Sequence, residues 1–350
     1  MHALLLQWQA EPAEPEPLVI ETSGSTGVPK RVALSRSAMR ASASATHRRL
    51  GGSGQWLLAL PSSHVAGVQV IFRSVLANTE PVFLEEHDDL VAAAAVMSGP
   101  RRYLSLVPTQ LTRLLTSDRD VAALRTFDTI LLGGAAIDPE LRKAAADAGL
   151  TIVATYGMSE TCGGCVYDGV ALDGVALALA ADGRIRIGGP VLFDGYDGQP
   201  DLTAEVLDDG WFLTSDFGRL DEDGMLQVLG RVDDVVISGG VNVSTRAVAS
   251  RLKEHGAIVA AEVVGVPDDE WGQRIVAVIA VDPSSDLDQI PLEAIRDFVG
   301  ATLSRTWAPR DVVVVETIPL LSNGKVDRVK VEQIAASAQR SRPATRETRP

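Results

Sequence analysis

A nine-residue segment near the start of this chain has the residue types of a phosphate-binding loop. It reads Thr22-Ser23-Gly24-Ser25-Thr26-Gly27-Val28-Pro29-Lys30. Glycines let backbone N–H groups approach phosphate oxygens, hydroxyls donate further hydrogen bonds, and Lys30 adds a full positive charge. The order does not fit Gly-x-x-x-x-Gly-Lys-Ser/Thr, so the segment is not a Walker A loop. From composition alone it is either a phosphate-binding loop or a flexible surface loop.

The charge of the chain limits its partners. Its 350 residues carry a formal net charge of −14, and lysine is confined to Lys30, Lys143, Lys253, Lys325 and Lys330. An acidic surface repels phosphate backbones and anionic lipid headgroups, so we expect neither nucleic-acid binding nor membrane insertion. The scarcity of lysine makes Lys30 and Lys325 informative, because both fall in Gly-rich or loop-like segments.

The ends of the chain and its two cysteines fit a cytoplasmic protein. The opening residues 1–6 form too short an apolar run for a signal peptide, and no stretch is long enough to span a bilayer. Cys162 and Cys165 form a lone Cys-x-x-Cys without the further ligands that zinc needs. A redox pair is one interpretation. The favoured one is two small residues in a glycine-rich turn, in a reducing cytosol.

Alternating strand and helix patterns predict a layered α/β fold for the first part of the chain. We expect buried strands at 18–20, 56–60, 103–107, 129–132 and 151–154, with helices after Ser35 and at 65–75, 108–115 and 139–148. A small antiparallel unit with a hairpin at 220–229 closes this domain. Helices at 245–255 and 291–303 and strands at 257–266, 274–281 and 311–316 predict a smaller α+β domain. The predicted boundaries are 1–232, 233–335 and a disordered tail at 336–350.

Five motifs in order resemble those of the adenylate-forming enzymes, the superfamily of acyl-CoA synthetases, adenylation domains and luciferases. The segment 22–30 is followed by four others: Gly133-Gly134-Ala135-Ala136, Tyr156-Gly157-Met158-Ser159-Glu160-Thr161, Thr214-Ser215-Asp216 with Gly230-Arg231-Val232-Asp233-Asp234, and Asn323-Gly324-Lys325-Val326-Asp327-Arg328. The resemblance implies adenylation of a carboxylic acid by ATP with Mg²⁺, then transfer of the acyl group to coenzyme A. It also implies that the smaller domain is mobile.

The resemblance implies a nucleotide site made from the first four motifs. Tyr156 would stack on adenine, Asp216 would accept both ribose hydroxyls, and Arg231 would support the ribose or phosphate. A half-buried aromatic and a hairpin ion pair are the structural alternatives for these residues. The full set of expected ATP- and AMP-binding residues is Thr22, Ser23, Gly24, Ser25, Thr26, Gly27, Lys30, Gly133, Gly134, Ala135, Ala136, Tyr156, Gly157, Met158, Ser159, Asp216 and Arg231.

The same resemblance implies the catalytic groups. Glu160 would hold Mg²⁺, which prefers carboxylate and phosphate oxygens. Lys325 would bridge the substrate carboxylate and the α-phosphate as negative charge builds up. Asp233 would be the hinge, and Ser238, Gly239 and Gly240 would approach coenzyme A. Two departures matter: Ser215 stands where the family usually has glycine, and Val241 stands where it often has glutamate.

The acid is predicted from the segment 60–75, in which His64 precedes an apolar helix that contains Arg73. A desolvated guanidinium needs an anionic partner. This arrangement, and the segment from Tyr156 to Cys165, resemble the o-succinylbenzoate–CoA ligases of menaquinone synthesis. The resemblance makes His64, Arg73 and Thr161 acid-binding residues and His64 also catalytic. The alternatives are another aromatic or short acid, a carrier-protein thiol as acceptor, and an inactive binding relic.

One departure concerns length. The family carries a large N-terminal subdomain before the phosphate loop, whereas here that loop begins at Thr22. The expectation is a compact form whose acid pocket is completed differently, with a homo-oligomer as one solution.

Overall fold

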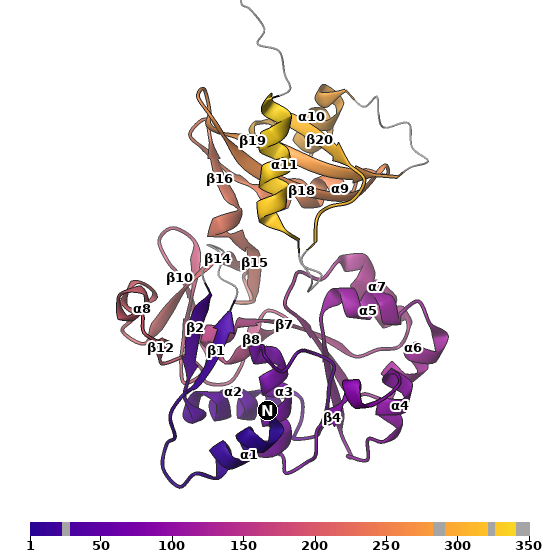
Figure 1. Cartoon of the computed structure of the whole chain (residues 1–350), viewed down its shortest axis with the longest axis vertical. Coiled ribbons are helices and arrows are strands. Elements are labelled where there is room, and N and C mark those ends of the chain that lie inside the picture. Colours follow the sequence, from indigo (N-terminus) through magenta and orange to yellow (C-terminus); the bar gives the residue numbers. More distant parts are fainter. Residues whose placement is uncertain (23–28, 283–290, 321–325, 341–350) are drawn as a thin grey trace, which may run out of the picture. The chain divides into compact units, whose positions relative to one another are not determined.

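The computed structural model describes residues 1–22, 29–282, 291–320 and 326–340 (Figure 1). The chain divides into two compact units, Met1–Val228 and Leu229–Pro350. Their boundary lies four residues before the one predicted from the sequence. Among the described residues, no helix is long and apolar enough to cross a membrane.

A seven-stranded sheet forms the centre of the first unit. Its strand order is β4-β3-β5-β6-β7-β8-β9. The strands from β4 to β7 are parallel, and β8 and β9 run antiparallel to their neighbours. The bounds are β3 (Gln55–Leu58), β4 (Val82–Phe83), β5 (Arg102–Leu106), β6 (Thr129–Gly133), β7 (Ile152–Met158), β8 (Gly163–Tyr167) and β9 (Val170–Ala171).

Both faces of this sheet are covered by helices, because successive residues of a strand point to opposite faces. Trp56 packs into one apolar core and its neighbour Leu57 into another. The first core is shared with α1 (His2–Ala10), α2 (Arg36–Arg49) and α3 (Val65–Leu76). The second is shared with α4 (Leu90–Ala95), α5 (Pro108–Leu114), α6 (Asp118–Leu124) and α7 (Pro139–Asp147) (Figure 1).

Two smaller antiparallel sheets complete the first unit. One has the order β1-β2-β12, and the other has the order β10-β11-β14-β13 with β15 paired to β14. The bounds are β1 (Leu18–Thr22), β2 (Lys30–Leu34), β10 (Ala176–Leu179), β11 (Arg184–Gly188), β12 (Gly195–Tyr196), β13 (Leu207–Asp208), β14 (Trp211–Leu220) and β15 (Leu226–Arg231), with α8 (Pro200–Val206) beside them. The predicted layered α/β domain with a small antiparallel part is confirmed.

The second unit is a small α+β assembly, as predicted. A hairpin joins β16 (Val235–Ser238) to β17 (Val241–Ser244). A second sheet pairs β18 (Ile258–Asp268) antiparallel to β19 (Gly272–Val281) and β19 parallel to β20 (Asp311–Val315). Its helices are α9 (Thr245–Lys253), α10 (Leu292–Gly300) and α11 (Arg328–Arg340).

The predicted disordered tail is wrong for residues 336–340. These residues continue α11, whose Val331 and Ala335 are buried against β18 and β19. The helix was not among the elements predicted from the sequence, because the Ala/Ser-rich end of the segment obscures its amphipathic spacing. Residues 341–350 lie outside the described residues.

Candidate functional site

Glu160 lies in the turn that reverses the chain between β7 and β8. The turn is a short 3-10 helix, Ser159–Thr161, followed by Cys162 in the left-handed conformation with φ 51°. The Thr161 hydroxyl contacts the main-chain N–H and O of Met158 and donates to Gly163 O, at 2.8 to 3.1 Å. Thr161 is fully buried, and its hydroxyl helps to shape the turn; its contact with the acid stays a prediction.

The Glu160 carboxylate is oriented by a tyrosine that the sequence did not single out. The Tyr196 hydroxyl donates to Glu160 Oε1 at 2.9 Å. Burial and the negative charge of Glu160 raise the pKa of Tyr196, so this hydroxyl stays a donor at neutral pH. Tyr196 carries no sequence signal, because it reaches Glu160 through the pairing of β12 with β2.

Lys30, the last residue of the phosphate-loop motif, lies over the ring of the same tyrosine. Its ammonium nitrogen lies 5.0 Å from the centre of the Tyr196 ring. Thr22 and Lys30 are the paired residues of the β1–β2 hairpin that flank its connecting loop. The expected loop residues Ser23, Gly24, Ser25, Thr26 and Gly27 lie outside the described residues. The structure thus brings Glu160, Tyr196 and Lys30 together at the base of this loop.

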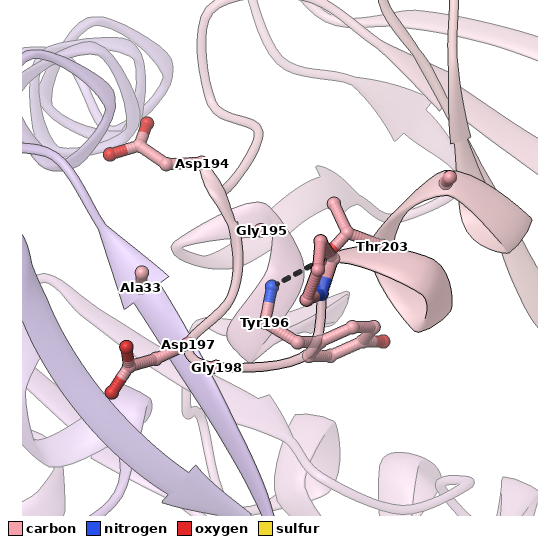
Figure 2. A pocket seen from close by; sticks show the side chains of 9 residues that line it. Ala33, Asp194, Gly195, Tyr196, Asp197, Gly198 and Thr203 are labelled. Atoms are coloured by element: carbon pink, nitrogen blue, oxygen red, sulfur yellow. Dashed lines mark hydrogen bonds between the residues drawn. The ribbon is translucent and has the colours of Figure 1, made fainter.

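A hollow of about 420 Å³ lies beside Tyr196 (Figure 2). It is lined by residues of β2, β12 and α8. Figure 2 shows Asp194 and Asp197 beside Ala33, with Tyr196 and Thr203 on the other side of the segment. The Tyr196 N–H donates to the Thr203 hydroxyl at 2.9 Å, which fixes this segment against α8.

A second polar pair joins two of the expected nucleotide-binding residues. The Tyr156 hydroxyl donates to Asp216 Oδ2 at 2.7 Å. Burial, followed by the charge of Asp216, raises the pKa of Tyr156, so its phenol remains protonated. Asp216 is 4 % exposed, and its N–H donates to the Thr214 hydroxyl. This pair favours a fixed carboxylate, which suits hydrogen bonds from ribose hydroxyls.

The other expected nucleotide-binding residues follow β6 and β7. Gly133 ends β6 opposite Thr155, and Gly134, Ala135 and Ala136 form the turn that follows. Gly157 must be glycine, because a Cβ there would meet Gly163 O at 2.1 Å. The remaining members of the set, Met158 and Ser159, lead into the Glu160 turn.

His64 and Arg73 lie at opposite ends of α3. His64 is exposed and precedes α3, whereas Arg73 is 4 % exposed and lies in the last turn of that helix. Nine residues of helix separate the two by roughly 13 Å along the axis. The Arg73 guanidinium carbon lies 4.9 Å from the centre of the Trp56 ring. Among the described residues it has no hydrogen-bond acceptor or carboxylate partner, and its Nε is buried without one.

The two cysteines are free and fully buried. Burial raises the pKa of the Cys165 thiol to about 12 and raises that of Cys162 as well. They pack into two different apolar cores. Neither is therefore a ready nucleophile or redox group, and the interpretation as small residues at a glycine-rich turn fits better.

The second unit carries the expected hinge and coenzyme A segment. Ser238 ends β16 and is buried, and Gly239 and Gly240 form the tight turn to β17 with φ 57° and 78°. A Cβ on Gly239 would meet the Trp271 ring at 2.7 Å, so this turn requires glycine. Asp233 lies in the 3-10 turn Val232–Asp234, and Arg231 ends β15 just before it. Lys325 lies outside the described residues.

The residues around Glu160 suit a magnesium ion that is shared with a nucleotide. Mg²⁺ is usually held by one or two carboxylates together with substrate phosphates and water. Glu160 offers a carboxylate with one oxygen held by Tyr196. Within the described parts of the chain, no group of three or more His, Cys, Asp or Glu residues could hold a metal by itself. The donor set therefore fits Mg²⁺ bound with ATP rather than a metal held by protein alone.

The chain belongs to the family of AMP-binding enzymes. Residues 8–210 match that family, and residues 247–325 match the AMP-binding enzyme C-terminal domain. The Glu160 turn, Tyr196 and the Lys30 hairpin all lie within the first match.

Several relatives share a more specific name. A probable 2-succinylbenzoate–CoA ligase of Mycobacterium tuberculosis strain H37Rv is 47% identical over 320 residues, which cover 89% of this chain and 82% of the relative. The 2-succinylbenzoate–CoA ligase of Listeria monocytogenes EGD-e is 32% identical, over 90% of this chain and 69% of that enzyme.

A solved structure resembles the fold over the same range. The o-succinylbenzoate CoA synthetase of Bacillus subtilis, in complex with the acyl-adenylate intermediate OSB-AMP, matches with a TM-score of 0.76 at 25% identity. The match covers 90% of this chain and 68% of that one. The same enzyme in complex with ATP and magnesium ion matches with a TM-score of 0.75 at 26% identity, over 89% and 69% of the two chains.

Proposed function

We propose that this protein is a 2-succinylbenzoate–CoA ligase of menaquinone biosynthesis. In the first step a carboxylate oxygen of the acid attacks the α-phosphorus of ATP, and pyrophosphate leaves. In the second step the coenzyme A thiol attacks the acyl carbon, and AMP leaves. The observation that carries the proposal is the 47% identity to a relative of that name, over a range that includes the Glu160 turn.

The geometry supports the first step. Lys30 places a positive charge at the base of the phosphate loop, and Tyr196 fixes one oxygen of Glu160. Bound Mg²⁺ supplies further positive charge to the phosphates. The Tyr156–Asp216 pair holds a carboxylate for the ribose. The roles of these residues, of Lys325 in the transition state and of His64 at the acid are part of the proposal.

Two residues at opposite ends of α3 bear on the choice of acid. His64 is exposed at the start of α3 and accessible to a ligand, whereas Arg73 is buried at the far end. The expectation that Arg73 binds a second carboxylate of the acid stays a prediction. Location in the cytoplasm and assembly into a homo-oligomer also stay predictions.

The decisive experiment is an acid panel with ATP, Mg²⁺ and coenzyme A, read by mass spectrometry of the thioester. We expect the thioester of o-succinylbenzoate, with kcat/KM exceeding that for benzoate and fatty acids by at least about 100-fold. A higher kcat/KM for another short or aromatic acid would make that acid, and not o-succinylbenzoate, the substrate. Acid-dependent exchange of pyrophosphate into ATP without any thioester would favour a carrier-protein acceptor. Silence in both assays would favour a binding relic.

Lys325→Ala provides the control for the division between the two steps. We expect it to abolish pyrophosphate exchange while sparing thioester formation from supplied acyl-adenylate, because its charge stabilises the negative charge that builds up between the acid carboxylate and the α-phosphate in the first step. Equal loss in both steps would contradict this role.

A further inference from the structure

The turn that carries Glu160 ends in an unfavourable backbone conformation. Cys162 has φ 51° and ψ 38°, the left-handed region that residues with a Cβ rarely adopt. Its side chain is fully buried, and its N–H donates to Ser159 O at 3.0 Å. Such a conformation persists where the surrounding structure holds it.

Two buried side chains from different helices hold this residue. The main-chain oxygen of Cys162 accepts hydrogen bonds from Ser42 Oγ of α2 at 3.0 Å and from Gln69 Nε2 of α3 at 2.8 Å. Ser42 and Gln69 are both fully buried. A carbonyl oxygen has two lone pairs, so both acceptor positions of Cys162 are used. Burying a polar side chain without a hydrogen bond costs free energy, so the bonds to the Cys162 carbonyl offset the burial of Ser42 and Gln69.

The hydrogen bonds to Cys162 also constrain Glu160, because the main chain between the two residues is itself hydrogen-bonded. Glu160 is two residues away, and its own main-chain oxygen accepts from Phe193 N–H at 2.9 Å. Between them the Thr161 hydroxyl contacts Met158 and Gly163. A rotation of the Cys162 peptide would therefore act on Glu160 through the Thr161 contacts and would strain its hydrogen bonds to Phe193 and Tyr196.

We propose that Ser42 and Gln69 are positioning residues for Mg²⁺-dependent ATP binding. They hold the Cys162 carbonyl and thereby fix the direction of the Glu160 carboxylate. This inference rests on the metal role of Glu160 in the proposed function.

The test measures ATP binding by calorimetry at stepped Mg²⁺ concentrations, with the full-length protein and no acid present. Gln69→Leu keeps the size of the side chain and removes its donor. We expect the Mg²⁺ concentration for half-maximal ATP binding to rise about tenfold, since loss of a group that orients a metal ligand typically costs 10- to 100-fold in metal affinity. Ser42→Ala should raise it less, and the double variant more than either.

Two matched variants separate positioning from core stability. Ser74→Ala removes a buried hydroxyl of α3 that donates to Val70 O, and Thr46→Val removes a buried hydroxyl of α2 that contacts Tyr167. Neither residue touches the turn. We expect both to lower the thermal midpoint as much as Ser42→Ala and to leave the Mg²⁺ dependence unchanged.

A rescue variant gives a second, independent readout. Glycine adopts the left-handed conformation without steric cost, so Cys162→Gly should make the two hydrogen bonds less necessary. Gln69→Leu combined with Cys162→Gly should return the Mg²⁺ requirement to within about twofold of the original protein, since glycine removes the steric penalty of that conformation.

Two results would overturn the inference. One is an unchanged Mg²⁺ requirement in the Ser42→Ala, Gln69→Leu double variant with a lowered thermal midpoint. The other is ATP binding by the original protein that does not depend on Mg²⁺. Neither depends on which acid is used, so a failure of the acid panel alone leaves this inference standing.

Discussion

Gln69 and Arg73 lie one turn apart on the same face of α3, and the structure treats them differently. Both are buried, with 0% and 4% of their surface exposed. Gln69 Nε2 donates to the main chain of the Glu160 turn, and its Oε1 has no hydrogen-bond partner among the described residues. The Arg73 guanidinium lies over Trp56, and its Nε has no acceptor among those residues. The amide is held by a directional hydrogen bond. The guanidinium has the face of the Trp56 ring as a partner but no carboxylate among the described residues, and burial lowers the pKa of Arg73.

In this core the contacts of a buried polar residue indicate its role, and its residue type does not. The sequence singled out Arg73 because a buried charge is unusual. It passed over Gln69, which is less unusual and contacts the site more directly. Four predictions test this contrast, beginning with the turn that Gln69 supports.

The largest effect is expected for Glu160→Gln. The amide keeps the size and one acceptor oxygen but loses the negative charge that Mg²⁺ prefers. Pyrophosphate exchange should fall at least about 100-fold, because charge stabilisation by a metal is worth several kcal/mol. The measurement is the exchange rate against Mg²⁺ concentration. A rate within a few fold of the original would remove Glu160 from the metal site.

Tyr196→Phe should have an intermediate effect. The change deletes the hydroxyl that donates to Glu160 and keeps the ring beside Lys30. We expect roughly a tenfold higher Mg²⁺ requirement, because partners of metal ligands typically contribute 10- to 100-fold. Thr46→Val, distant from the Glu160 carboxylate, is the control. An equal shift in both variants would indicate a general loss of structure.

Arg73→Met tests the other side of the comparison. The methionine fills a similar apolar volume and removes a buried charge that has no carboxylate partner among the described residues. The free energy of unfolding should therefore rise by about 1 kcal/mol. Denaturant unfolding measures this. The same variant settles whether Arg73 selects the acid. Retained preference for o-succinylbenzoate over benzoate would end that prediction, and a tenfold loss would support it.

The smallest effect concerns His47, which packs near Trp56 and Arg73. Burial, followed by the charge of Arg73, lowers the pKa of His47 to about 4. The unfolded chain has the ordinary value near 6.5, so the unfolded state binds the proton first as the pH falls. The stability from neutral His47 is full above about pH 6.5 and is lost towards pH 4.

In Arg73→Met the pKa of His47 should rise without reaching its ordinary value, because burial remains the larger cause. Histidine signals in an NMR titration measure this directly. An unchanged pKa would place the Arg73 charge too far away to act on His47.

The elements with local signals could be predicted from the sequence. Buried strands such as β5 and β6 appear as short apolar runs, and Ser35 does cap α2, accepting from Ala38 N–H. Helix α1 was missed, because its buried face is set by Leu5 and Trp8 packing on a core that is distant in sequence. A nine-residue helix that depends on such contacts has no strong pattern of its own.

The site shows the same division. Glu160, Tyr156, Asp216 and Lys30 lie in motifs with a fixed local order, and the resemblance of those motifs to the family implied their roles, which stay predictions. Tyr196 enters through strand pairing and Gln69 through helix packing, neither of which a single sequence displays. The exposure of His64 and the burial of Arg73 were also beyond the sequence, because residue spacing gives their positions along the helix but not how deep each lies.

The two hydrogen bonds to Cys162 also have a kinetic meaning. They connect residues 120 and 93 positions apart along the chain. Contacts of such separation form late in folding, since long loops must close before they are made, whereas the β7–β8 hairpin can form locally. In the proposed function, the turn is therefore ready to bind nucleotide only after α2 and α3 have packed against it at the end of folding. A chain with its β7–β8 hairpin formed but α2 and α3 undocked would lack both hydrogen bonds to the Cys162 carbonyl.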